Sequence, residues 1–195
     1  MQIMNFTCPL PPSVNSYLGK RVAYSPITKK PFVQVYETAE AKSYKRYMKK
    51  VLERACMKSG WSKSGEFTYV ICEMDVYLNQ KRRDVDNLFK CMLDTLTENG
   101  IVYDDSMVIP RVKKVFIDKD NPRLEVTIRE SSKVGVFANS KQLGEFEEGN
   151  CKRCSRFSKN CSIRKASLEN KIKSEITKDE NGVYSCIALK AKKGD

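Results

Sequence analysis

One long alternating stretch, followed by a charged loop and a short helix, constrains the fold of this chain more than any other feature. Over residues 67–78, apolar side chains recur at every second position, which is the period of a strand with one buried face. A helix is predicted over residues 87–98, with Asn99 and Gly100 as its stop signal. The charged loop between the two segments is thereby held at the junction of a buried strand and a helix.

Shorter segments with similar patterns flank this pair. Thr38 can cap a helix that runs to about Lys58, because its apolar positions recur every three or four residues. Further strands are predicted at 2–8, 21–27, 32–36, 112–117 and 124–128, and the last two are expected to form a hairpin. This order of strands and helices predicts an α+β fold, with a mixed β-sheet and packed helices, that ends near Glu130.

Two acidic pairs bracket the helix predicted over 87–98. Asp84 and Asp86 stand two residues apart, so their side chains point the same way in an extended segment. Asp104 and Asp105 follow one helix length later. Carboxylates packed closely repel one another unless a cation lies between them, and Mg²⁺ favours such oxygen ligands. If the chain folds back to join the two pairs, the pattern indicates a metal-dependent phosphodiesterase site.

Cationic side chains surround these carboxylates. Arg82 and Arg83 precede them, and Lys90 lies one helical turn past Asp86, where it can neutralise charge that develops on a phosphate. Each of these residues could instead have a purely structural role. Asp86 could cap the helix, Asp84 could form an ion pair with Arg82 or Arg83, and Lys90 could be an ordinary surface lysine. The chain has no histidine, which excludes nucleases that need a histidine base, nucleophile or metal ligand. Hydrolysis must therefore use carboxylates, a metal ion and lysine.

The charge of the chain indicates a polyanionic partner. Lysine and arginine number 36 against 24 acidic residues, a net charge of +12, although an ordinary basic surface would show the same excess. The N-terminus shows no signal peptide, and no apolar run approaches the roughly 20 residues of a membrane span. We therefore expect a cytoplasmic protein whose eight cysteines are thiols or metal ligands rather than disulfides.

Several of these motifs together resemble the signature of RusA-type Holliday junction resolvases, which are small endodeoxyribonucleases of bacteria and phages. The acidic stretch matches from Arg82 to Lys90 and again from Gly100 to Asp105. Residues 10–17 are similar to the family's opening, which contains Pro-Pro-Ser-x-Asn, and Arg123–Ile128 is similar to its last strand. The resemblance covers residues 1 to about 130, in the right order and with similar spacing.

The resemblance implies a homodimer that binds four-way DNA junctions and makes paired, symmetric nicks with Mg²⁺ or Mn²⁺, in DNA recombination and repair. A two-fold dimer suits a junction, because each subunit can cut one strand. The family's essential carboxylates fall on Asp84, Asp86 and Asp105 and its catalytic lysine on Lys90, with Asp94 and Asp104 as neighbours. The side chains expected to contact DNA are Arg82, Arg83, Asn15, Lys113 and Lys114.

Two other functions fit the same residues. A recombination accessory protein could keep the fold and bind branched DNA without cleaving it, but the intact set of Asp84, Asp86, Asp105 and Lys90 argues against this reading. A nuclease with the same site could instead cut flaps or other branched DNA.

The C-terminal part lies outside the resemblance. Periodicity fades over 132–150, where three glycines occur, so we predict a linker between a nuclease domain at 1–131 and a cysteine-rich module at 151–195. Cys151, Cys154, Cys161 and Cys186 follow a C-x₂-C-x₆-C-x₂₄-C spacing, which suggests a structural Zn²⁺ site. A bound metal could supply much of the folding energy of so short a module. The alternatives are an iron–sulfur cluster and unliganded thiols.

Overall fold

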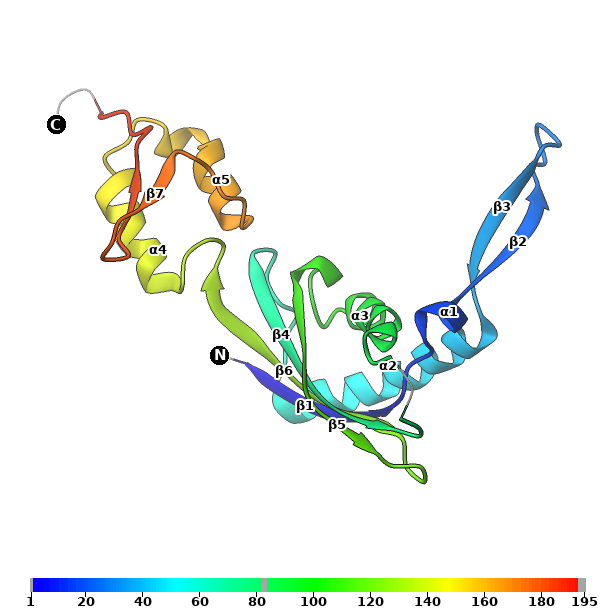
Figure 1. Ribbon diagram of the computed structural model, residues 1–195. Coiled ribbons are helices and arrows are strands. Elements are labelled where there is room, and N and C mark those ends of the chain that lie inside the picture. Colours follow the sequence, from blue (N-terminus) through cyan, green and yellow to red (C-terminus); the bar gives the residue numbers. More distant parts are fainter. Residues whose placement is uncertain (1, 82–83, 193–195) are drawn as a thin grey trace. The chain divides into compact units, whose positions relative to one another are not determined.

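The computed structural model describes residues 2–81 and 84–192, which divide into two compact units. Unit 1 consists of Met1–Gly65 and Val70–Glu130, and unit 2 consists of Glu66–Tyr69 and Ser131–Asp195. Unit 1 combines a mixed sheet with helices, so the predicted α+β class is confirmed (Figure 1). Within the described ranges, no helix has both the length and the apolar character that a bilayer crossing requires.

The main sheet has the strand order β1-β6-β4-β5. β1 (Ile3–Pro9) pairs antiparallel with β6 (Arg123–Val134). β4 (Thr68–Leu78), the long strand predicted from the sequence, pairs in parallel with β5 (Val108–Ile117). A parallel pair requires a crossover, and the helix that carries Lys90 forms this crossover between β4 and β5. The acidic stretch therefore lies on the connection between the two parallel strands.

The hairpin predicted for residues 112–128 is wrong. β5 and β6 follow one another in the chain, yet β4 lies between them in the sheet. The intervening turn therefore passes across the end of β4, where the N–H of Asp118 donates a hydrogen bond to the carbonyl oxygen of Leu78 at 2.8 Å. The physical reason is the helical crossover, which places β5 on one edge of β4 and leaves the other edge for β6.

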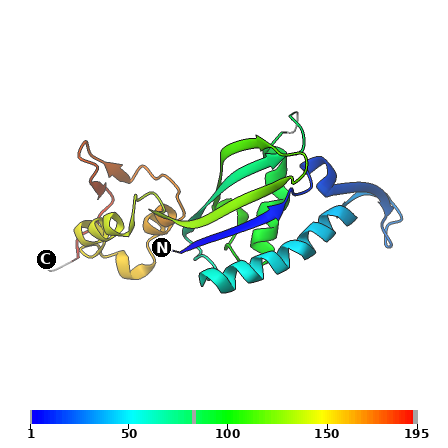
Figure 2. The same ribbon diagram turned by 90° about the horizontal axis from the view of Figure 1, so that it is seen from below.

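Helices α2 (Ala39–Ser59) and α3 (Phe89–Glu98) pack on the apolar face of this sheet (Figure 2). Thr38 caps α2, as predicted, and its hydroxyl oxygen accepts a hydrogen bond from the N–H of Ala41 at 3.3 Å. Gly60 ends the helix at φ +70°, a left-handed conformation that glycine adopts without steric cost. The buried core that strands and helices share includes Met4, Phe6, Met48, Leu52, Cys72, Met74, Val76, Met92, Leu96, Leu124 and Ile128.

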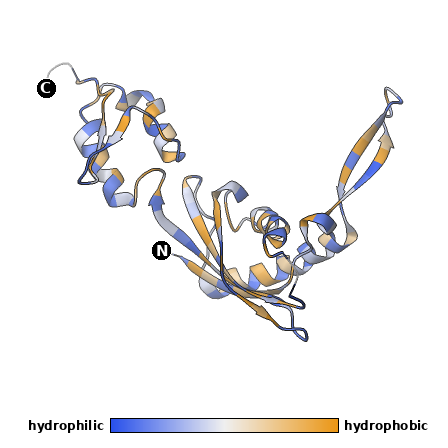
Figure 3. Ribbon diagram, viewed as in Figure 1, coloured by the Kyte–Doolittle hydropathy of each residue, from blue (hydrophilic) through white to orange (hydrophobic). Residues whose placement is uncertain are grey.

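Between β1 and α2 the chain forms a short helix and a two-stranded arm. α1 (Val14–Tyr17) comes first, and β2 (Leu18–Tyr24) then pairs antiparallel with β3 (Pro31–Glu37). This arm is a sheet of its own, in which apolar and polar residues both face solvent (Figure 3). The arm therefore adds surface to unit 1 rather than core.

Unit 2 is a small mixed fold with its own core. Its helices are α4 (Ser140–Phe146) and α5 (Ser162–Leu168), and its short strands β7 (Ile176–Lys178) and β8 (Tyr184–Cys186) pair antiparallel. Single turns join them: η3 (Glu147–Cys151) and η4 (Phe157–Lys159). The buried cluster consists of Phe137, Phe146 and Cys151.

The structure differs from the linker predicted over residues 132–150. This range contains the end of β6, all of α4 and the core residues Phe137 and Phe146. One of the glycines that suggested a linker has a packing role: Gly135 has φ +57°, and an added Cβ would lie 2.0 Å from the carbonyl oxygen of Ser167. Glycine is required at this position by a close backbone approach, a constraint that a linker does not have.

Candidate active site

The acidic stretch leaves β4 and enters α3 through a single 3₁₀ turn, η1 (Asp86–Leu88). Asp84 and Asp86 are both exposed. In the described residues, no side chain caps the N-terminus of η1 or of α3. The alternative in which Asp86 is a helix cap is therefore not the one that the structure shows. Asn87 Nδ2 donates a long hydrogen bond of 3.5 Å to Asp84 Oδ2. The fold therefore leaves both carboxylates facing solvent and open to a ligand.

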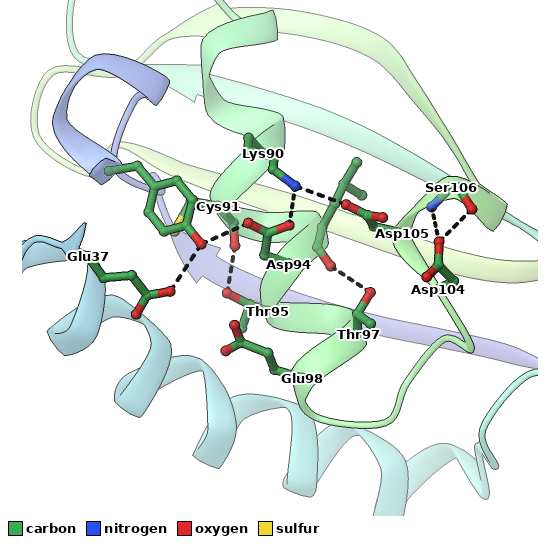
Figure 4. A network of polar contacts seen from close by, with 12 residues as sticks. Glu37, Lys90, Cys91, Asp94, Thr95, Thr97, Glu98, Asp104, Asp105 and Ser106 are labelled. Carbon is green, nitrogen blue, oxygen red and sulfur yellow. Dashed lines mark hydrogen bonds and ion pairs between the residues drawn. The ribbon is translucent and has the colours of Figure 1, made fainter. Parts of the chain in front are cut away.

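Lys90 lies in the first turn of α3 between two further carboxylates (Figure 4). Its ammonium nitrogen donates to Asp94 Oδ1 at 2.6 Å and to Asp105 Oδ2 at 3.0 Å. These hydrogen bonds, first the one to Asp94 and then the one to Asp105, raise the pKa of Lys90 above its ordinary value. Lys90 is therefore a positive charge at neutral pH, suited to neutralising an anion rather than to accepting a proton.

The other oxygen of Asp94 is held by a buried tyrosine from the N-terminal motif. Tyr17, which is 4% exposed, donates its hydroxyl proton to Asp94 Oδ2 at 2.7 Å. Burial raises the pKa of Tyr17, and the hydrogen bond to Asp94 raises it further, so the phenol stays protonated and remains a donor. Asp94 is thus held on one side by Tyr17 and on the other by Lys90.

A second layer of charges supports this tyrosine. Glu37, at the end of β3, accepts a hydrogen bond from the Tyr17 hydroxyl at 3.2 Å and forms an ion pair with Lys45 of α2. Lys45 also pairs with Glu98 at the end of α3. The network thereby ties α1, the arm, α2 and α3 to the segment that carries Lys90.

The second acidic pair divides into two roles. Asp104 caps η2 (Asp105–Met107), because its Oδ1 accepts a hydrogen bond from the N–H of Ser106 at 2.9 Å. Hydrogen bonds from Ser106 lower the pKa of Asp104. Asp105 instead turns its carboxylate towards Lys90 across the chain reversal. The chain folds back after α3, so that Asp105 meets Lys90 at the beginning of that helix.

The residues expected to contact DNA fall in different places. Asn15 is exposed on α1, which packs against η1 and α3 and so lies beside the acidic loop. Lys113 points towards Asp75, with 3.9 Å between Nζ and Oδ2, and Lys114 is exposed on the same strand, β5. Side chains along β4 alternate between the buried face of the sheet and the opposite face, and Asp75 lies on the opposite face, away from the helices. The last two predicted residues, Arg82 and Arg83, lie outside the described residues.

No group of three or more histidine, cysteine, aspartate or glutamate side chains stands in a metal-holding arrangement in the part of the chain that the structure describes. The donor chemistry of Asp84, Asp86 and Asp105 nevertheless fits a hard cation, because all three offer exposed or half-exposed carboxylate oxygens. Asp105 is held by Lys90 in this arrangement and would have to turn towards the other two carboxylates to share an ion with them.

Four of the eight cysteines lie in unit 1 and four in unit 2. Cys56, in α2, is half-buried. Cys8, Cys72 and Cys91 are buried in unit 1, where burial raises their pKa to about 12, 12 and 11. They are inert core thiols at neutral pH. The four C-terminal cysteines all line one cavity of unit 2: Cys151, Cys154, Cys161 and Cys186.

Sequence reasoning missed the network behind Lys90. The spacing of Lys90 and Asp94, four residues apart on a helix, is a signal that could have identified that ion pair. Tyr17 and Asp94 are separated by 77 residues, and no local pattern reports such a contact.

Comparison with known proteins agrees with this arrangement. The family described as "Endodeoxyribonuclease RusA" matches residues 9–129. Proteins named crossover junction endodeoxyribonuclease RusA from Escherichia coli strain K12, Shigella sonnei strain Ss046 and Enterobacteria phage 82 are each 30% identical over 131 residues, which cover 67% of this chain and 97% of the relative. The matched residues include the acidic stretch, Lys90 and Asp105, whereas the cysteine-rich part lies beyond them. The chain therefore belongs to the RusA endodeoxyribonuclease family.

Proposed function

We propose that this protein is a Mg²⁺-dependent endodeoxyribonuclease that resolves four-way DNA junctions during recombination and repair in a bacterial cell, encoded by the bacterium or by a phage. The observation that carries the proposal is the position of Lys90, whose ammonium group lies between Asp94 and Asp105 at the start of the helix that follows Asp84 and Asp86. Membership of the RusA family and the names of the relatives supply the substrate class.

The carboxylates of Asp84, Asp86 and Asp105 would hold the metal ion, Mg²⁺ or Mn²⁺. When bound, such an ion lowers the pKa of a coordinated water and stabilises the departing 3′ oxygen. The ion would also reduce the repulsion between the carboxylates that hold it.

Lys90 would contact the phosphate that is cleaved. An ammonium group has three N–H donors, and in this structure Asp94 and Asp105 take two of them. The donor to Asp105 would become free when Asp105 turns to the ion. The third remains for a phosphate oxygen, and a fixed positive charge there favours the more negative transition state over the ground state. Since hydrogen bonding raises the pKa of Lys90, this charge persists across the neutral range.

Binding should depend on phosphate contacts and on the shape of the branched DNA more than on base sequence. The net charge of +12 supplies the electrostatic attraction. We include Asn15, Lys113, Lys114, Arg82 and Arg83 among the DNA contacts. A homodimer would present two equivalent sites to the two-fold symmetric junction and so make paired, symmetric nicks.

The test is cleavage of a synthetic four-way junction and a matched linear duplex, each with Mg²⁺ and with EDTA. Paired nicks in the junction alone, and only with the metal, are the expected result. Lys90→Ala should bind the junction and fail to cut it. Tight junction binding by the unaltered protein, without nicks at any divalent metal, would replace this proposal with the non-cleaving accessory function.

A further inference from the structure

Four thiols from three separate segments of unit 2 surround one small cavity. Cys151 and Cys154 come from the turn after α4, Cys161 immediately precedes α5, and Cys186 ends β8. The four are free thiols and form no disulfide. The cavity has a volume of about 20 Å³, which is room for one water-sized object. Its remaining wall is formed by Phe146, Asn150, Phe157, Ile163, Arg164 and Leu189.

We propose that this cavity binds one structural Zn²⁺ ion through the sulfur atoms of Cys151, Cys154, Cys161 and Cys186. Four cysteine ligands around a single ion form the tetrahedral set that Zn²⁺ adopts in structural sites. In the described residues these side chains do not stand in a metal-holding arrangement, so zinc binding would draw the four sulfur atoms together around the cavity. Each thiol loses its proton to the solvent as its sulfur binds zinc, and no electron is transferred. The site is separate from the nuclease carboxylates and does not depend on the function proposed for them.

The backbone around the cavity is built from two similar turns that face each other. In the first, the N–H of Cys154 donates to the carbonyl of Cys151 at 2.9 Å, and in the second, the N–H of Leu189 donates to the carbonyl of Cys186 at 3.2 Å. Ser155 N–H donates to the carbonyl of Lys190 at 2.8 Å and joins the two turns. Main-chain hydrogen bonds thereby hold the turn of Cys151 and Cys154 beside the turn of Cys186, although these cysteines are far apart in the sequence.

Backbone N–H groups also point at two of the sulfur atoms. The N–H groups of Lys190 and Arg156 face Cys154 and lower the pKa of its thiol. The N–H of Ala188 acts in the same direction on Cys186, although burial raises the pKa of that thiol overall. The N–H two residues after each of these two cysteines, that of Arg156 or of Ala188, contributes in both cases.

The size of unit 2 gives a reason for a metal. Its buried hydrophobic cluster contains Phe137, Phe146 and Cys151, with Cys186 among the half-buried residues packed against it. A core this small rarely stabilises a fold without disulfides, a metal or an oligomer. A zinc ion at the cavity would join the turn after α4 to the start of α5 and the end of β8.

The volume of the cavity suits a single ion. A space of about 20 Å³ is room for one water-sized object, whereas an iron–sulfur cluster contains several iron and sulfide atoms. Of the apolar side chains on the wall, Phe146 is buried, Leu189 is half-buried and Phe157 is exposed.

The test is elemental analysis of the purified full-length protein, together with three variants. We expect about one zinc per chain in the unaltered protein, and the same content in Cys56→Ser, whose thiol lies in α2 of unit 1. Cys154→Ser and Cys186→Ser should lose most of the zinc. Unaltered zinc content in both of these variants would overturn the assignment, as would folded protein without zinc or with iron and labile sulfide.

Cobalt substitution keeps the proposal testable if the serine variants fail to fold. Metal-free protein, prepared by acid or chelator and refolded with Co²⁺, should show the intense visible bands of tetrahedral cobalt and an ultraviolet thiolate-to-cobalt band. Addition of Zn²⁺ should remove both. Weak octahedral bands without a thiolate signal would overturn the four-sulfur site. Junction cleavage is not a readout here, so a failure of the nuclease proposal leaves this result unaffected.

Discussion

Replacing Asp94 with asparagine tests whether this residue positions the catalytic lysine. Asp94 uses one oxygen for Lys90, at 2.6 Å, and the other for the Tyr17 hydroxyl, at 2.7 Å. An asparagine side chain has one oxygen and one NH₂ group, so it can accept from only one of these two donors. Asp94→Asn therefore removes the negative charge that faces Lys90. It also places the NH₂ group of asparagine against one of the two donors, the Lys90 ammonium or the Tyr17 hydroxyl.

The size of the effect follows from the exposure of the pair. A hydrogen bond to a charged group contributes about 1.5–3 kcal/mol. The Lys90 side chain is 50% exposed and that of Asp94 18%, so solvent screening reduces this to about 1–2 kcal/mol. Since about 1.4 kcal/mol corresponds to a factor of ten in rate, kcat for junction cleavage should fall roughly 5- to 30-fold, with little change in junction affinity.

The pH profile separates positioning from a loss of stability. Asp94 is the first cause of the raised pKa of Lys90, so removing its charge lowers that pKa. The ammonium form is then lost at a lower pH, and the alkaline limb of the rate profile should move to lower pH. Asp118→Asn is the matched control, because it breaks an ion pair with Arg123 in unit 1 away from Lys90. An unchanged kcat and an unchanged alkaline limb in Asp94→Asn would refute the positioning role.

Four further outcomes are expected. Asp86→Asn should abolish cleavage and retain junction binding in a gel-shift assay; joint loss of both would remove its role as a metal ligand. Binding should weaken with salt at a log–log slope of about −0.9 per neutralised phosphate, and a flat response would contradict phosphate contact. Gly135→Ala should lower the free energy of unfolding of unit 2 by about 1–3 kcal/mol in denaturant titrations, because φ is +57° and the new Cβ meets the carbonyl of Ser167 at 2.0 Å. The hydrogen bond from Lys45 lowers the pKa of Glu37 in the folded protein. The ionised Glu37 side chain therefore stabilises the fold above the unfolded pKa of about 4.3, and this contribution disappears as the pH falls through the folded pKa. Glu37→Gln lacks this contribution, so its free energy of unfolding should fall less steeply with acid below about pH 4.3. Identical acid unfolding curves for the variant and the unaltered protein would contradict this.

Local patterns predicted the individual elements well. The two-residue alternation of β4 placed Cys72, Met74 and Val76 on the buried face, and all three are buried. Thr38 caps α2 as predicted, and the helix ends at Ser59, close to the predicted Lys58, because capping is a property of a few neighbouring residues. The several motifs that resemble the RusA family are confirmed by the match over residues 9–129.

The sequence by itself determined the types of the main elements of unit 1, the acidic motif and the family, since each depends on residues close together in the chain. Only the tertiary structure decided that β4 separates β5 from β6, because strand order depends on the path of the crossover helix rather than on any turn. Tertiary contacts also brought Tyr17 to Asp94 and Asp105 to Lys90, pairs that are 77 and 15 residues apart. The four C-terminal cysteines line one cavity, and main-chain hydrogen bonds join the turn of Cys151 and Cys154 to that of Cys186.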